Sequence, residues 1–166
     1  DYRQVYDMGI VCNTTRNNFF ASMAQELSTE HNVLIFTDEV EHRDLIVGTL
    51  MDMGIAPYAI DGKMNKKQKM SQIQDVASIE NGAVTVATSA IGVGTNLPLV
   101  SVVILMGGGK SFNKIIQQSG RATRFVEGIK EDCLVINPID FFNEKLMKHS
   151  LKRKNDLSDY FLKESE

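Results

Sequence analysis

Short, almost wholly apolar segments recur along the chain, and segments with helical spacing of apolar residues separate them. The segments predicted to form strands are 32–37, 56–60, 83–88, 99–106 and 132–137. The segments predicted to form helices are 13–28, 39–53, 65–79 with Asn65 as N-cap, and 112–122; the charged stretch 139–166 is also helix-prone. Such alternation is typical of a parallel sheet covered on both faces. The pattern therefore predicts an α/β, three-layer sandwich with a mainly parallel sheet of five or more strands.

Composition narrows the function classes without selecting one. The 166 residues carry 18 basic and 21 acidic side chains, for a net charge of −3. No apolar run reaches the roughly 20 residues of a membrane span, so we expect no membrane partner. An acidic chain would need a local basic patch, or half of a composite site, to bind nucleic acid. Cys12 and Cys133 lack CxxC spacing and the histidines are scattered, so we expect a reducing, cytoplasmic compartment and no metal site.

The densest motif is QQSGRATR, residues 117–124. On a helix, Gln117, Arg121 and Arg124 share one face. Gly120 costs a helix roughly 1 kcal/mol relative to alanine, which makes sense where something packs or binds closely. Two arginines on one stripe suit an anion with several oxygens, because each guanidinium can bind two of them. A solvated basic face on an amphipathic helix remains the alternative.

A second group of candidates lies where predicted strands end. Thr88 and Ser89 follow the strand 83–88, and Thr37 ends the strand 32–37. Ligands of parallel α/β sheets bind at the carboxyl ends of strands, where hydroxyls and free amides can hold a phosphate. Lys63 belongs to a lysine-rich turn after the strand 56–60. An ordinary strand-to-helix loop and a solvated helix start remain the alternatives.

The stretch LMGGGKSFN, residues 105–113, nearly matches a P-loop. A Walker A motif ending in Gly109-Lys110-Ser111 requires glycine at position 104, which is Ile104 here. We expect instead that the glycines let the chain turn from a strand into the next helix, with Ser111 as N-cap. A self-contained P-loop NTPase or kinase, and a non-catalytic α/β interaction domain, remain open as alternative functions.

Taken together and in this order, the motifs resemble the second, C-terminal RecA-like domain of superfamily 2 helicases and translocases. QQSGRATR matches the motif VI pattern Q-x-x-G-R-x-x-R, ATSAIGVGTNLP (87–98) resembles motif V, and VLIFTDEVEH (33–42) resembles motif IV. Asn96 and Ser89 stand where many members carry Asp, and Asp61 stands where His is common. The opening residues 1–20 resemble the lead-in of phage-type and excision-repair-type DNA helicases.

The resemblance implies a RecA-like domain over 1–140 and a helical extension over 141–166. It implies an arginine finger at Arg124, with Arg121 and Gln117 beside it. The remaining implied contacts are Gly94, Asn96 and Gly120 for ATP, and Thr88, Ser89, Thr37 and Lys63 for nucleic acid.

The same resemblance implies partners that the chain itself does not supply. We expect ATP with Mg²⁺, whose metal ligands lie in an N-terminal RecA-like domain of the same protein, and a DNA strand. The chain opens on Asp1 and shows no Walker A loop, so we expect it to be part of a longer protein and inactive alone. We expect the cytoplasm, or the host cytoplasm for a phage-encoded protein.

Overall fold

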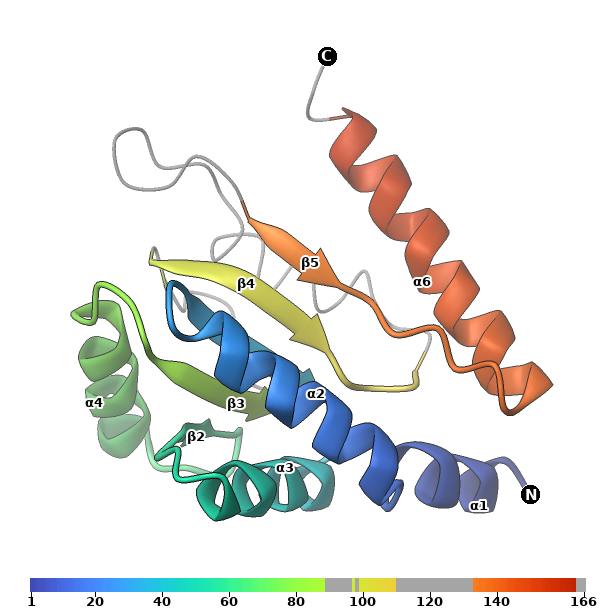
Figure 1. The fold of residues 1–166 in the computed structure, drawn as a ribbon, viewed down its shortest axis with the longest axis horizontal. Helices are drawn as coiled ribbons and strands as arrows, with labels where there is room; N and C mark the ends of the chain where they lie inside the picture. Colours follow the sequence, from blue (N-terminus) through green and yellow to red (C-terminus); the bar gives the residue numbers. More distant parts are fainter. Residues whose placement is uncertain (89–96, 98, 110–132, 164–166) are drawn as a thin grey trace.

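A single parallel sheet organises the chain. The computed structural model describes residues 1–88, 97, 99–109 and 133–163. Its strands are β1 (Asn32–Thr37), β2 (Tyr58–Ile60), β3 (Val84–Thr88), β4 (Val100–Leu105) and β5 (Leu134–Ile136). They lie in the order β2-β3-β1-β4-β5, and every pairing is parallel (Figure 1). The predicted five-stranded parallel sheet is confirmed.

Helices cover both faces of this sheet. They are α2 (Thr14–Leu27), α3 (Val40–Asp52), α4 (Lys66–Ala77) and α6 (Glu144–Lys163). Along β1, Val33 and Ile35 join a buried cluster with residues of α2 and α3. Leu34 and Phe36 join a second cluster with residues of α4 and α6. Because successive side chains of a strand point to opposite faces, this division gives the three predicted layers.

The N-terminal residues form a small third core with the start of α6. They fold into α1 (Tyr2–Tyr6) and one π-helical turn, η1 (Asp7–Val11). Tyr6, Ile10 and Val11 are buried together with Leu146 of α6. In Figure 1 the orange first turn of α6 lies near the blue N-terminal helix. The N-terminal residues are thereby packed against the start of α6.

Helix ends follow local sequence signals. Asn65 caps α4 as predicted, because its side-chain oxygen accepts a hydrogen bond from the Gln68 N–H at 2.9 Å. Helix α3 ends before Gly54, whose φ of 82° is a left-handed conformation that favours glycine. The predicted helix 112–122 and the predicted cap Ser111 lie outside the described residues. Within the part of the chain that the structure covers, no helix is long and apolar enough to cross a membrane.

Candidate nucleic-acid interface

The carboxyl ends of β1, β3 and β2 lie at one edge of the sheet. Three predicted nucleic-acid contacts end or follow these strands: Thr37, Thr88 and Lys63. Thr37 is in register with Thr88, and Ile60 is in register with Ala87. Asp61 therefore follows β2 beside the end of β3. Parallel strands place all their carboxyl ends at the same edge, which is where ligands of such sheets bind.

Thr37 and Thr88 are both buried at this edge of the sheet. Thr37 is 0% exposed and Thr88 is 4% exposed. The Thr37 hydroxyl donates a hydrogen bond to the Glu39 carbonyl at 3.1 Å, which holds the turn between β1 and α3. In this arrangement Thr37 has a local structural task, and its hydroxyl is not presented to solvent.

Lys63, in contrast, is exposed on a turn that a carboxylate organises. Asp61 accepts hydrogen bonds from the Lys63 and Met64 N–H groups, the latter at 3.0 Å, and forms an ion pair with Arg43. Burial alone would raise the pKa of Asp61, but the Lys63 N–H and the Arg43 guanidinium outweigh it and lower the pKa. Asp61 thus stays ionised and fixes the loop from which Lys63 projects.

The N-terminal end of α4 continues this basic surface. A hollow of about 510 Å³ lies over its first two turns, lined by Asn65, Lys67, Gln68, Ser71 and Gln72. Lys66 and Lys67 are exposed beside it. A local positive patch therefore adjoins the sheet edge on an acidic chain, as a phosphate-binding edge requires.

The glycine run after β4 packs against a carboxylate. The Gly109 N–H donates a hydrogen bond to Asp38 Oδ2 at 3.0 Å. A Cβ on Gly107 would lie 2.5 Å from Asp38 Cγ, and a Cβ on Gly108 would lie 2.8 Å from Ile10 Cγ1. Neither glycine adopts a positive φ. Gly107 and Gly108 are therefore needed for close approach, whereas the predicted turn into a following helix leads into residues outside the described ones and stays a prediction.

This packing also bears on the P-loop alternative. A phosphate loop presents free N–H groups to an anion, whereas the Gly109 N–H is already bound to the negatively charged Asp38. Sequence inspection missed Asp38 because its partners are Tyr6 and Gly109, distant in the sequence; Tyr6 donates its hydroxyl proton to Asp38 at 2.8 Å. Burial, and then the Asp38 charge, raise the pKa of Tyr6, so it remains a donor.

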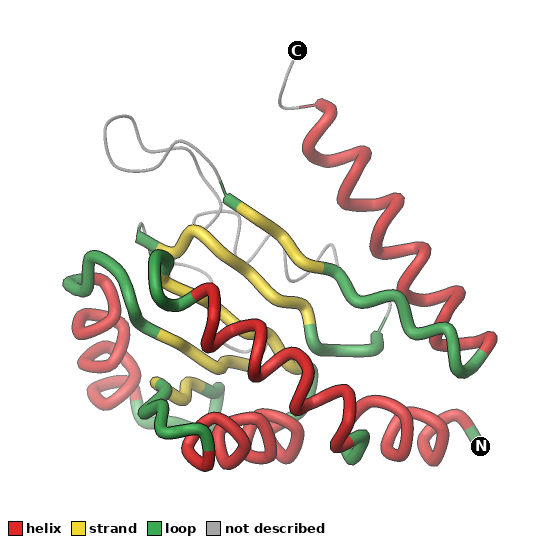
Figure 2. The backbone as a smooth tube through the Cα atoms, viewed as in Figure 1, coloured by secondary structure: helices red, strands yellow, loops and turns green. Residues whose placement is uncertain are grey.

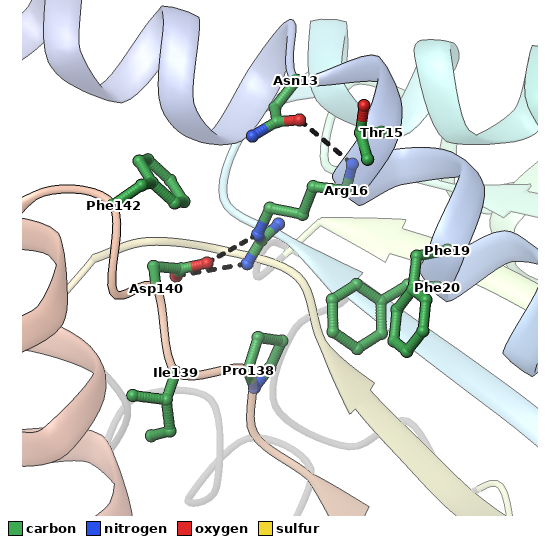
Figure 3. Close-up of a pocket in the computed structure, with 9 residues that line it drawn as sticks. All are labelled: Asn13, Thr15, Arg16, Phe19, Phe20, Pro138, Ile139, Asp140 and Phe142. Atoms are coloured by element: carbon green, nitrogen blue, oxygen red, sulfur yellow. Dashed lines mark hydrogen bonds and ion pairs between the residues drawn. The ribbon is translucent and has the colours of Figure 1, made fainter.

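A second hollow lies at the same edge of the sheet on the α2 face. Its volume is about 480 Å³, and its lining includes Phe19, Phe20, Phe142 and Pro138. Figure 3 shows the Arg16–Asp140 ion pair between Phe142 on one side and Phe19 and Phe20 on the other. Arg16 Nε lies 2.8 Å from Asp140 Oδ1. The ion pair is almost completely buried, so it offers no free charge to a ligand.

All the predicted catalytic and ATP-binding residues lie outside the described residues: Gly94, Asn96, Gln117, Gly120, Arg121 and Arg124. The predicted nucleic-acid contact Ser89 also lies outside them. Among the residues that the structure does describe, no group of three or more His, Cys, Asp or Glu side chains could hold a metal ion.

Comparison with known families gives a match over most of the chain. Residues 16–126 match the helicase conserved C-terminal domain family. The sequence is 25% identical over 143 residues to the pre-mRNA-processing ATP-dependent RNA helicase PRP5 of Vanderwaltozyma polyspora, and 26% identical over 125 residues to the human ATP-dependent RNA helicase DDX24. These alignments cover 86% and 75% of this chain but only 16% and 14% of the two relatives.

Solved structures share the fold at low identity. T4 UvsW superposes with a TM-score of 0.71 and 19% identity, covering 96% of this chain and 35% of that one. The C-terminal domain of the DEAD-box protein Dbp5 superposes with a TM-score of 0.67 and 17% identity, covering 89% and 81%. The names of the sequence relatives do not support the expectation of DNA. The parallel sheet and the family match agree: the chain has the fold of the C-terminal domain of Dbp5 and belongs to the helicase conserved C-terminal domain family.

Proposed function

We propose that this chain is the C-terminal motor half of an ATP-dependent helicase or translocase. The observation that carries the proposal is the family match over 16–126, which includes Q-x-x-G-R-x-x-R at 117–124. ATP would be hydrolysed where this domain meets an N-terminal RecA-like domain that supplies the Walker A loop and the Mg²⁺ ligands. Nucleotide-dependent closure and reopening of the two domains would move the protein along a strand.

Each predicted residue has a defined task in this mechanism. The Arg124 guanidinium stabilises charge on the transferring γ-phosphoryl group, a contribution of about 10³–10⁵ in rate for arginine fingers. Arg121 binds phosphate oxygens beside it, and Gln117 orients the attacking water. Gly94, Asn96 and Gly120 allow close approach to the nucleotide from this side.

The strand lies along the carboxyl edge that carries Lys63 and the ends of β1 and β3. Lys63 and the N-terminal end of α4 contribute positive charge. The backbone and side chains near Thr37, Thr88 and Ser89 would hold phosphates, which positions a strand without reading its sequence. We propose DNA as the strand because of the lead-in 1–20; the named RNA helicases among the relatives make RNA the alternative to test.

The deciding experiment uses the full-length protein. We expect ATP hydrolysis that a single strand stimulates, and loss of at least 10³-fold in turnover in Arg124→Ala with ATP binding largely retained. Lys154→Ala, an exposed substitution on α6, is the matched control and should leave turnover unchanged. Retained turnover in Arg124→Ala would remove Arg124 from this role.

Two further measurements define the proposal. Stimulation by single-stranded DNA and by RNA of the same length and base order, compared at one salt concentration, decides between the two strands; stronger stimulation by RNA would overturn the DNA assignment. The isolated 166-residue chain should hydrolyse no ATP. Measurable hydrolysis by the isolated chain would favour a self-contained NTPase instead.

A further inference from the structure

The segment Gly107–Gly109 follows β4 and precedes residues 110–132 in the sequence. Side chains from three parts of the fold contact it: Asp38 after β1, Tyr6 of α1, and Arg153 and His149 of α6. Asp38, at the junction of β1 and α3, accepts the Gly109 N–H. Figure 2 shows this segment as a loop running between the N-terminal helices and α6. Residues 110–132, which contain Arg121 and Arg124, follow this loop directly in the sequence.

Contacts from α6 hold the carbonyl side of the same loop. Arg153 donates through one terminal nitrogen to the Gly109 carbonyl at 3.0 Å and through Nε to Asn137 Oδ1 at 2.9 Å. His149 Nδ1 lies 3.3 Å from the Gly108 carbonyl oxygen. Both the N–H and the C=O of Gly109 are thus bound, although the segment forms no helix or strand.

Asp38 differs from these contacts because it also belongs to the proposed strand-binding edge. It directly follows Thr37, the last residue of β1. Its Oδ2 accepts both the Tyr6 hydroxyl at 2.8 Å and the Gly109 N–H at 3.0 Å. The space left by the absent Gly107 side chain brings the loop directly against its carboxyl group. The Asp38 carboxylate thus links the carboxyl end of β1 to the glycine loop through one hydrogen bond.

We propose that Asp38 is a positioning residue for ATP turnover: it transmits occupancy of the carboxyl edge of β1 to the segment that carries Arg121 and Arg124. The inference rests on the proposed function, since it assigns these arginines to ATP. Asp38 touches neither nucleotide nor metal in this scheme. It acts by holding Gly109, and Tyr6 holds the Asp38 carboxylate in the required orientation.

The test compares Asp38→Ala, Asp38→Asn and Glu39→Ala in the full-length protein. Glu39 is the matched control, because it lies at the same junction. Its carboxylate pairs with Arg3 of α1 and forms no hydrogen bond or ion pair with the described residues Gly107–Gly109. The readouts are kcat and KM for ATP with and without a saturating single strand, strand affinity, and thermal unfolding.

We expect Asp38→Ala to lower the strand-stimulated kcat at least tenfold, with KM for ATP and strand affinity changed less than about threefold. Asp38→Asn, which keeps an acceptor oxygen for Gly109, should restore most of the stimulation, and Glu39→Ala should retain it. A purely structural role predicts instead that Asp38→Ala loses activity only in proportion to the unfolded fraction. That outcome, or full stimulation in Asp38→Ala, overturns the inference.

Hydrogen exchange separates this failure from failure of the proposed function. The Gly109 amide should exchange at least tenfold faster in Asp38→Ala than in the Glu39→Ala control, because it loses its acceptor. An unstimulated wild type would refute the proposed function and the inference with it. A stimulated wild type with an unchanged Asp38→Ala variant refutes only the inference.

Discussion

Arg16 of α2 and Asp140, which follows β5, form a buried ion pair. Arg16 Nε lies 2.8 Å from Asp140 Oδ1, and a terminal nitrogen of Arg16 donates to the Met106 carbonyl at 2.9 Å. Arg16 stands in the first turn of α2, and Asp140 follows β5. The pair therefore connects helix α2 to the segment between β5, the last strand of the sheet, and α6.

Removal of Asp140 alone should be strongly destabilising. Asp140→Ala leaves the buried Arg16 guanidinium without its counter-charge, and such a loss costs about 3–5 kcal/mol. The free energy of unfolding, measured by denaturant titration, tests this. The exposed Lys152–Asp156 pair of α6 is the control, and Asp156→Ala should cost below about 1 kcal/mol. Equal effects of the two substitutions would mean that Arg16 gains no net stabilisation from Asp140.

His42 should make the stability depend on pH. It is buried, and because Asn17 Oδ1 can only accept, His42 Nε2 carries the proton and donates to it at 3.0 Å. Burial, then the Arg16 charge, lower the pKa of His42 to about 3. Between pH 7 and pH 5 the unfolded chain takes up a proton at this histidine and the folded chain does not. The free energy of unfolding therefore decreases as the pH is lowered from 7 to 5.

The expected loss is about 2 kcal/mol between pH 7 and pH 5. Denaturant unfolding of the wild type and of His42→Gln at both pH values measures it. The glutamine variant keeps an N–H donor for Asn17 but does not titrate. Its loss of unfolding free energy between pH 7 and pH 5 should therefore be about 2 kcal/mol smaller than that of the wild type. Identical pH dependences in the two proteins would show that the pKa of His42 is the same in the folded and the unfolded chain.

Local patterns were sufficient to predict the layers of this fold. The apolar run along β1 is continuous in the sequence, which predicts a strand buried on both faces. Strand geometry then divides Val33 and Ile35 on one face from Leu34 and Phe36 on the other. Asn65 could be predicted as a cap because its hydrogen bond spans only three residues. Such signals depend on neighbours in the chain, and therefore need no knowledge of the tertiary structure.

The site was less predictable because its contacts join distant residues. Asp38 and Gly109 are 71 positions apart, and Arg16 and Asp140 are 124 apart. No spacing rule links such pairs. Of the predicted nucleic-acid contacts, Lys63 is exposed as expected of a phosphate-binding lysine, whereas burial of the Thr37 hydroxyl depends on the turn that it stabilises.

Gly107 should tolerate no side chain. Its Cβ would meet the Asp38 carboxyl group at 2.5 Å, and Asp38 is held by Tyr6 and Gly109. Gly107→Ala should therefore cost roughly 1–3 kcal/mol through overpacking. Gly48 of α3 is the control, since nothing lies within 4 Å of its Cβ position; Gly48→Ala should stabilise by about 0.5–1 kcal/mol. Thermal unfolding compares the two, and a neutral Gly107→Ala would show that Asp38 can move aside.

Lys63 should contribute charge rather than sequence preference to strand binding. Its turn is fixed by the Asp61 carboxylate, and its side chain is exposed at the carboxyl edge of the sheet. In the full-length protein, Lys63→Ala should weaken binding of every strand sequence alike. It should also reduce the slope of log affinity against log salt concentration by about 0.7, the value for one phosphate contact on a single strand. Fluorescence anisotropy at several salt concentrations measures the slope, and Lys154→Ala on α6 supplies the control for loss of one exposed charge. An unchanged slope in Lys63→Ala would place the strand elsewhere on the domain, because each ion released on binding must appear in that slope.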